Sequence, residues 1–179
     1  SGSAGAPSLN QLYQLSCGPS AEIRVSATGV SQFSLASPMA GSALKKTGPG
    51  TLALNGSGMR SLAQGLTIEA GVVALNGGSL PNPVTVGLPG GIASAELELN
   101  TISPVPHRLT VNLGCAARCN VSGIEVAELT LRDGAITGSP RRLTGPLYVL
   151  AGENGSDITG GTELVGGSNL WTVEDGPAE

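Results

Sequence analysis

The sequence of 179 residues predicts an all-β protein built as a parallel β-helix or a similar solenoid. No long window places apolar residues at helical three-and-four spacing without a Gly or Pro inside it. Short alternating or aliphatic segments recur instead, each bounded by Gly, Pro or Asn. An antiparallel β-sandwich is the alternative, because Asn-Gly corners also close hairpins.

The expected elements follow one another from the N-terminus with few interruptions. Residues 8–15, SLNQLYQL, are expected to form a short turn of helix. From residue 21 onward, each segment that alternates or is wholly aliphatic and ends at a turn-forming residue is expected to be a strand. In chain order these strands are 21–27, 31–37, 50–56, 65–71, 71–77, 82–88, 95–101, 108–114, 123–134 and 146–152. We therefore expect an N-terminal arm at 1–20, a β-rich core domain at 21–152 and a Gly-rich C-terminal segment at 153–179 that packs on the core or on a neighbour.

Three segments share one phrase, in which alternating aliphatic residues precede Asn-Gly or Asp-Gly and then a corner of small residues. They are GTLALNGSG, GVVALNGGSL and ELTLRDGAITGS. Asn-Gly and Asp-Gly tolerate a positive φ and so can turn the chain at such a corner. Because each unit of a solenoid buries its apolar face only by stacking on a neighbour, the repeated phrase favours the solenoid over the sandwich.

The first two phrases resemble the passenger-associated, or autotransporter-associated, β-strand repeat. The likeness covers residues 44–80, and the matching positions are Lys46, Gly48, Gly50, Thr51, Leu52, Leu54, Gly56, Thr67, Ile68, Gly71, Val73 and Leu75. The stretch 58–65 departs from the family pattern, which commonly has an aromatic residue there. The resemblance implies an exported bacterial surface protein with a β-helical passenger, and hence an extracellular scaffold without catalytic activity.

Composition excludes several classes of partner. Only 12% of the residues are charged and the net charge is -4, so no basic stripe is available to neutralise nucleic acid. No apolar run reaches the length of a bilayer span, and we expect no membrane span. Aromatic residues make up 2% of the chain, which leaves few platforms for stacking sugars or bases. Arg141 and Arg142 are expected to form ordinary surface charge facing an acidic C-terminal segment.

The cysteines do not fit a metal site. Cys115 and Cys119 are spaced C-x3-C, and the single histidine, His107, follows Pro106 in a different segment. We therefore expect no metal and no cofactor. In an exported protein a disulfide is expected, either closing the 115–119 loop or linking Cys17 to one of these two residues.

Three N-glycosylation sequons are present, at Asn55, Asn120 and Asn154. They are candidate glycosylation sites in a compartment that glycosylates proteins.

No catalytic residue is expected. His107 is the only base available for a triad, and its position after a proline at a strand entrance indicates a loop residue. Glu96 and Glu98 lie on one strand face, as an acid and a base would in a polysaccharide-cleaving β-helix, but a solvated outer face explains them better. The segment 152–161, GENGSDITGG, is one copy of a calcium-like phrase, and a single copy cannot build a calcium roll.

The sequence therefore favours a secreted structural protein that assembles with copies of itself into a surface filament or layer. A neighbouring subunit would accept terminal segments into its sheet by strand addition. The candidate inter-subunit anchors are Leu9, Leu12, Leu15, Leu164, Leu170 and Val173. The alternative is an adhesive passenger fragment that binds a cell-surface or carbohydrate partner, and a polysaccharide-active enzyme is the weakest hypothesis.

Overall fold

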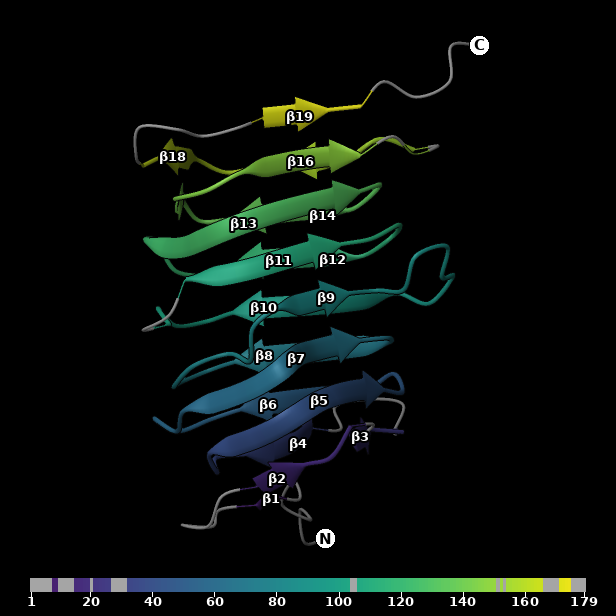
Figure 1. Cartoon of the computed structure of the whole chain (residues 1–179), viewed down its shortest axis with the longest axis vertical. Helices are drawn as coiled ribbons and strands as arrows, with labels where there is room; N and C mark the ends of the chain where they lie inside the picture. Colours follow the sequence, from purple (N-terminus) through teal and green to yellow (C-terminus); the bar gives the residue numbers. More distant parts are fainter. Residues whose placement is uncertain are drawn as a thin grey trace, which may run out of the picture.

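The computed structural model describes residues 8–9, 15–19, 21–26, 32–103, 106–150, 152, 154–165 and 171–174. These residues form an all-β rod in which the chain winds upward from the N-terminal to the C-terminal end (Figure 1). Every pairing between the described strands is parallel. The fold is therefore a parallel β-solenoid, as predicted, because a sandwich would require antiparallel hairpins.

One face of the solenoid is an eight-stranded sheet, called sheet A here, to which each coil contributes one short strand. Its strands in spatial order are β1 (Ser8–Leu9), β4 (Gln32–Leu35), β6 (Thr51–Leu54), β8 (Gly71–Leu75), β10 (Ala95–Leu99), β12 (Ala116–Cys119), β14 (Ala135–Gly138) and β17 (Asp157–Ile158).

The other face, sheet B, contains eleven strands because some coils cross it with one strand and others with two. Its main path is β2 (Leu15–Cys17), β5 (Met39–Thr47), β7 (Arg60–Ile68), β9 (Val84–Val86), β11 (His107–Val111), β13 (Ile124–Arg132), β15 (Arg141–Leu143) and β18 (Thr162–Leu164). Beside this path, β3 (Ala21–Arg24) pairs with β5, while β16 (Leu147–Leu150) pairs with β13 and with β19 (Trp171–Val173).

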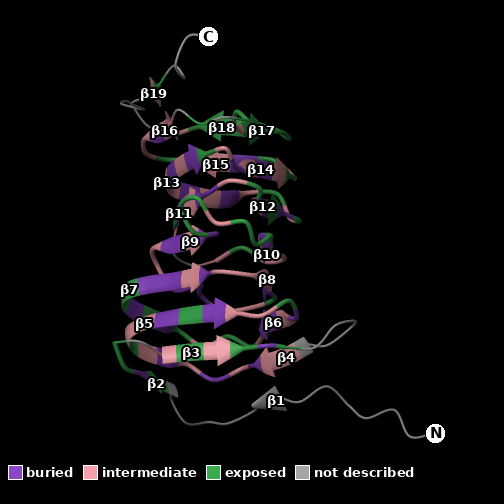
Figure 2. Cartoon of the chain, turned by 90° about the vertical axis from the view of Figure 1, so that its right-hand side faces the viewer, coloured by how far each residue is buried: buried purple, intermediate pink, exposed green. Residues whose placement is uncertain are grey.

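The core consists of side chains stacked in columns along the rod. In sheet A, one column runs through Leu35, Leu54, Leu75, Leu99 and Cys119, all of them fully buried. Each such leucine contributes roughly 1.5–3 kcal/mol through burial alone. Figure 2 shows the same pattern, with buried residues through the middle coils and exposed residues at β17 and β18. A solenoid of this kind is stabilised by like side chains in register from coil to coil.

The pairing between the long strands β5 and β7 is irregular where each strand contains a glycine. The register between β5 and β7 shifts between Gly41 and Ala43. Gly65 adopts φ +77°, and a Cβ atom there would lie 1.8 Å from the carbonyl oxygen of Pro83 in the next coil. Only glycine allows both this backbone conformation and this close approach. The irregular register therefore coincides with a position where neighbouring coils approach too closely for any other residue.

The repeated phrase is confirmed as a stacking unit over its first two copies, because Leu52 lies beside Val73 and Leu54 beside Leu75. The third copy, ELTLRDGAITGS at 128–139, spans both sheets, because its aliphatic half lies in β13 of sheet B and Ala135–Gly138 forms β14 of sheet A. Its aliphatic half therefore does not stack on the first two copies, whereas Ile136 of its second half continues the column of Leu52 and Val73.

Some expected elements differ from the structure. The helix expected at 8–15 is wrong over its described residues, because Ser8 and Leu9 form β1 and Leu15 begins β2. The described parts of the expected arm at 1–20 thus pair with strands of the same chain. Sequence analysis also missed β5, since Gly41 and two adjacent lysines interrupt its apolar alternation.

The segment 153–179 packs on the core over its described residues. Its three strands, β17, β18 and β19, pair with β14, β15 and β16. The segment is therefore the last coil of the solenoid, built on the same plan as the coils before it.

Candidate functional site

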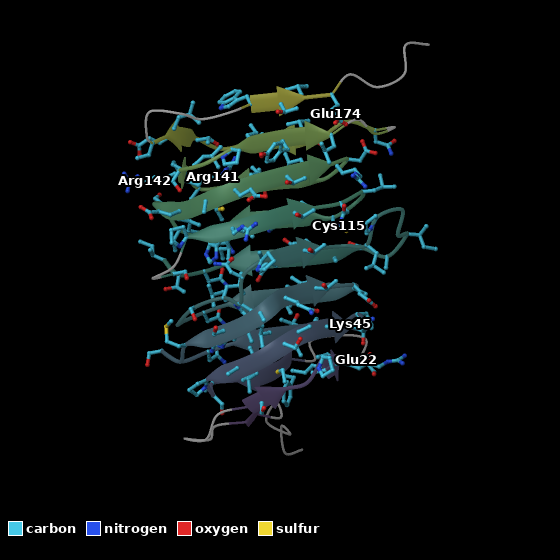
Figure 3. The ribbon with its side chains drawn as sticks, viewed as in Figure 1. Glu22, Lys45, Cys115, Arg141, Arg142 and Glu174 are labelled. Carbon is cyan, nitrogen blue, oxygen red and sulfur yellow. The ribbon has the colours of Figure 1, made fainter. Side chains whose placement is uncertain are left out.

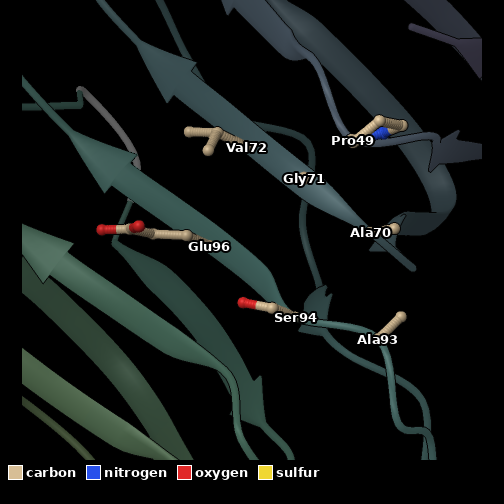
Figure 4. A pocket seen from close by; sticks show the side chains of 7 residues that line it. All are labelled: Pro49, Ala70, Gly71, Val72, Ala93, Ser94 and Glu96. Carbon is tan, nitrogen blue, oxygen red and sulfur yellow. The ribbon is translucent and has the colours of Figure 1, made fainter. Parts of the chain in front are cut away.

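A hollow of about 480 Å³ lies where the coils enter sheet A (Figure 4). Its lining residues are Pro49, Ala70, Gly71, Val72, Ala93, Ser94 and Glu96. Glu96 is the lining residue with a charged side chain, and its Oε1 atom lies 3.0 Å from Nε of Arg118. The lining contains no histidine or lysine that would deprotonate Ser94 as a triad requires.

His107 lies in the core and not in a loop. Its side chain is 1% exposed, and neither ring nitrogen has a hydrogen-bond partner among the described residues. Burial lowers the pKa of His107 to about 4, because the charged imidazolium would lose its hydration. The ring is therefore neutral at physiological pH and has no access to a substrate.

The carboxylates of β10 face outward, as expected for a solvated sheet face. Glu96 and Glu98 alternate with the fully buried Leu97 and Leu99 along the strand. Within the described part of the chain, no group of three or more His, Cys, Asp or Glu residues is arranged to hold a metal ion.

The three cysteines are free thiols, and all are buried. Cys115 precedes β12 and Cys119 ends it, so an extended strand of about 13 Å separates them. A disulfide requires Cα atoms within about 7 Å of each other. The expected 115–119 disulfide is therefore excluded by the strand. Cys17 lies in β2, in the first coil, four to five strand spacings from the others along the rod, and forms no disulfide either.

Two of the sequon asparagines belong to a ladder of side-chain amides at the end of sheet A. Asn76 Nδ2 donates to Asn55 Oδ1 at 2.9 Å, and Asn100 Nδ2 donates to Asn76 Oδ1 at 2.8 Å. Asn120 Nδ2 in turn donates to Asn100 Oδ1 at 2.6 Å. The third sequon residue, Asn154, is exposed, and its backbone N–H donates to a carboxylate oxygen of Asp133 at 3.1 Å.

The sequence contains a signal for this ladder that also fits a set of Asn-Gly turns. The pattern apolar-x-apolar-Asn occurs at 52–55, 73–76, 97–100 and 117–120. Each asparagine directly follows a strand of sheet A, and the strands are in register. The asparagines therefore stabilise the stacking of coils in addition to turning the chain.

Three basic side chains lie inside the solenoid, at positions where no charged residue was expected. Lys46, Arg60 and Arg141 are at most 3% exposed. Arg60 donates from its two terminal nitrogens to four backbone carbonyls, those of Leu35, Asn55, Gly77 and Ser79. The carbonyls at the corners of the coils therefore solvate these cations in place of a carboxylate.

Arg141 corrects the expectation of a surface basic pair. Arg141 is buried and donates to the carbonyl oxygen of Thr159 at 3.0 Å. Only Arg142 lies at the surface, where its guanidinium contacts carboxylate oxygens of Glu125 at 2.9 Å and Glu163 at 3.4 Å. Figure 3 labels both arginines near the upper coils.

The remaining candidate site consists of the two ends of the rod. Among the described residues, β1, β2 and β3 pair with neighbours on one side only, and so do β17, β18 and β19 at the other end. At the C-terminal end Leu164, Trp171 and Val173 are 46%, 54% and 65% exposed. Each end thus presents backbone groups that another strand can pair with, and the C-terminal end adds apolar side chains.

The predicted inter-subunit anchors fall at these ends where the structure describes them. Leu9 lies in β1 and Leu15 in β2, and Leu164 and Val173 are exposed in the last coil. Leu12 and Leu170 lie outside the described residues.

Comparison with known proteins places the chain in no family: no family model, curated protein or solved structure matches it. The described part of the chain contains no helix that is long and apolar enough to span a membrane.

Proposed function

We propose that this protein is a non-catalytic structural component of an extracellular surface, and that copies of it assemble end to end into a filament or layer. The observation that carries the proposal is the pair of sheet ends that have no partner among the described strands, one of which exposes Leu164, Trp171 and Val173. Solenoids that remain monomeric generally cover their ends with polar caps. Strand edges left open in this way favour addition of another chain.

Three features support a structural role over an enzymatic one. The single histidine is buried and neutral, and Glu96 is occupied by an ion pair with Arg118. The end of sheet A carries a ladder of asparagine amides that joins neighbouring coils. The likeness of residues 44–80 to a surface-protein repeat supports an extracellular location.

The test is electron microscopy and sedimentation of the purified chain over a range of concentrations, with and without reductant. We expect uniform fibres whose mass increases with concentration. Because all three thiols are buried and free, reductant should not change fibre growth. Isolated rods of constant mass at every concentration would contradict self-assembly.

An adhesive role is the second candidate, and the loop between β9 and β10 favours it. In this loop Ile92 is fully exposed and Leu88 is 42% exposed. Solvent-exposed apolar side chains on a protruding loop can anchor a partner. If adhesion is the function, I92D should abolish binding to a cell-surface or carbohydrate partner without changing fibre growth, and a monomer should bind as well as a polymer.

A further inference from the structure

The first and last coils of the solenoid present equivalent strands at the same position of sheet B. The register between neighbouring strands connects β3 to β19 through one continuous column. The members of this column are Ala21, Leu44, Leu66, Val84, Leu109, Leu129, Leu147 and Trp171. A second copy placed one strand spacing beyond the C-terminal end would therefore bring its β3 beside β19 without a change of register.

The direction of the strands determines how two copies can meet. All described pairings in the rod are parallel, and β3 and β19, at opposite ends, each pair with described strands on one side only. Joining the C-terminal end of one copy to the N-terminal end of the next continues the parallel ladder. Such a head-to-tail contact uses two different surfaces and leaves both outer ends open, so assembly continues as a filament and does not stop at a dimer.

The side chains that would meet at this junction are complementary in size. Continuing the register places Trp171 opposite Ala21 and Val173 opposite Ile23. Trp171 and Val173 are more than half exposed, whereas Ala21 and Ile23 are partly buried against the core. The large indole thus faces a small residue, and the two aliphatic side chains extend the inward column of β5 and β16.

The charges at the junction are complementary as well. The residue after Val173 is Glu174, whose backbone N–H donates to the carbonyl oxygen of Val149, and the residue after Ile23 is Arg24. Both side chains are exposed, and neither forms an ion pair with another described residue. Glu174 and Glu22, the neighbour of Ile23, lie at opposite ends of the rod in Figure 3.

We propose that copies of this chain stack head to tail, with β19 of one copy pairing in parallel with β3 of the next, and with Glu174 of the first forming an ion pair with Arg24 of the second. Neighbouring strands lie about 4.8 Å apart, a distance that an arginine and a glutamate span easily. This inference rests on the proposed function, self-assembly, and adds to it the polarity, the register and the contact that selects the partner.

Charge reversal on each side of the junction tests the inference. R24E alone places two carboxylates opposite each other at every junction, and E174R alone places two guanidinium groups there. We expect each variant to raise the critical concentration for fibre growth about tenfold or more. An equimolar mixture should again form fibres near the wild-type critical concentration, because an alternating polymer has an opposite-charge pair at every junction. The double variant R24E/E174R should behave in the same way.

Arg132 provides a matched control, since it is exposed at the end of β13, in the middle of the rod. R132E should assemble like the wild type, and circular dichroism should confirm that all variants fold. Wild-type protein that never forms fibres overturns both the proposed function and the inference. Fibres that form equally well in R24E and E174R, or a mixture that fails to recover, overturn the inference alone and leave self-assembly standing.

Discussion

Lys46 provides the most direct test of how the core of this solenoid is built. Its side chain is 0% exposed and occupies an inward position between Ile23 and Ile68, where other coils carry aliphatic residues. The ammonium group donates to the carbonyl oxygens of Gly48 at 2.7 Å and Ala70 at 2.8 Å. Loss of hydration on burial lowers the pKa of Lys46 from 10.5 to about 8.

The stability of the protein should therefore rise with pH on account of Lys46. The folded pKa lies below the unfolded one, so the folded state loses its proton first, and stability increases from about pH 8 to pH 10.5. The difference between these two pKa values corresponds to roughly 3 kcal/mol in the free energy of unfolding. We expect about 2 kcal/mol to be observed, because the two accepting carbonyls are only partly buried and water reduces the cost of the charge.

The assay is urea unfolding of the wild type and K46M between pH 7 and pH 10.5, followed by far-UV circular dichroism. Methionine has a similar length and no charge. Burial raises the pKa values of the three cysteines, so their titration lowers the stability of both proteins at high pH. Subtracting one curve from the other cancels this shared contribution. The unfolding free energy of the wild type minus that of K46M should increase by about 2 kcal/mol as the pH rises.

Lys45 is the control for this experiment. Its exposed ammonium group pairs with Glu69 at 2.8 Å, and this hydrogen bond raises the pKa of Lys45. K45M should therefore retain the rise in stability between pH 8 and pH 10.5. If the wild-type and K46M curves remain parallel over this range, the conclusion that burial lowers the pKa of Lys46 is refuted.

Three further perturbations test other parts of the fold. N76A removes two hydrogen bonds of the asparagine ladder, and N120A removes one. We therefore expect N76A to lower the free energy of unfolding in urea by about 1–3 kcal/mol, and N120A to lower it by about half as much. Equal losses in the two variants would argue against a ladder. Burial lowers the pKa of His107 from 6.5 to about 4, so the stability present above pH 6.5 should be lost as the pH falls toward 4. H107L should remove this loss in acid-unfolding curves. If H107L is as sensitive to acid as the wild type, a group other than His107 takes up the proton. G65A brings a Cβ onto the carbonyl oxygen of Pro83 at a positive φ and should lower the melting temperature by about 10 °C or more, and a melting temperature within two degrees of the wild type would contradict the close approach.

Local sequence patterns were sufficient to predict the class of the fold. Alternating aliphatic residues followed by Asn-Gly at 50–56 and 71–77 are strands in the structure, and they stack on each other as the repetition indicated. Glu96 and Glu98 were placed correctly on an outer face for the same reason, since strand residues alternate between faces. These properties depend on neighbours along the chain, so the sequence contains them directly.

The candidate site could be predicted only in part. Leu164 and Val173 were proposed as anchors from the sequence, and they lie exposed in the last coil. Their partners Ala21, Ile23 and Arg24 were not recognised, because residues about 150 positions apart become equivalent only when every intervening coil is stacked in register.

Patterns along the chain are enough to establish that this protein is a stack of short strands with largely aliphatic interiors and glycine or asparagine corners. The tertiary structure decided what each coil places against the next. Residues 51, 72, 96 and 116 share one column although their spacings differ, so no fixed period in the sequence reveals which side chains meet. Stacking alone brings carbonyls around Lys46 and Arg60, separates Cys115 from Cys119 along a strand, and leaves β3 and β19 as matching ends. The physical reason is that strand register is set by the burial of whole columns, a property of the assembled rod and not of any single segment.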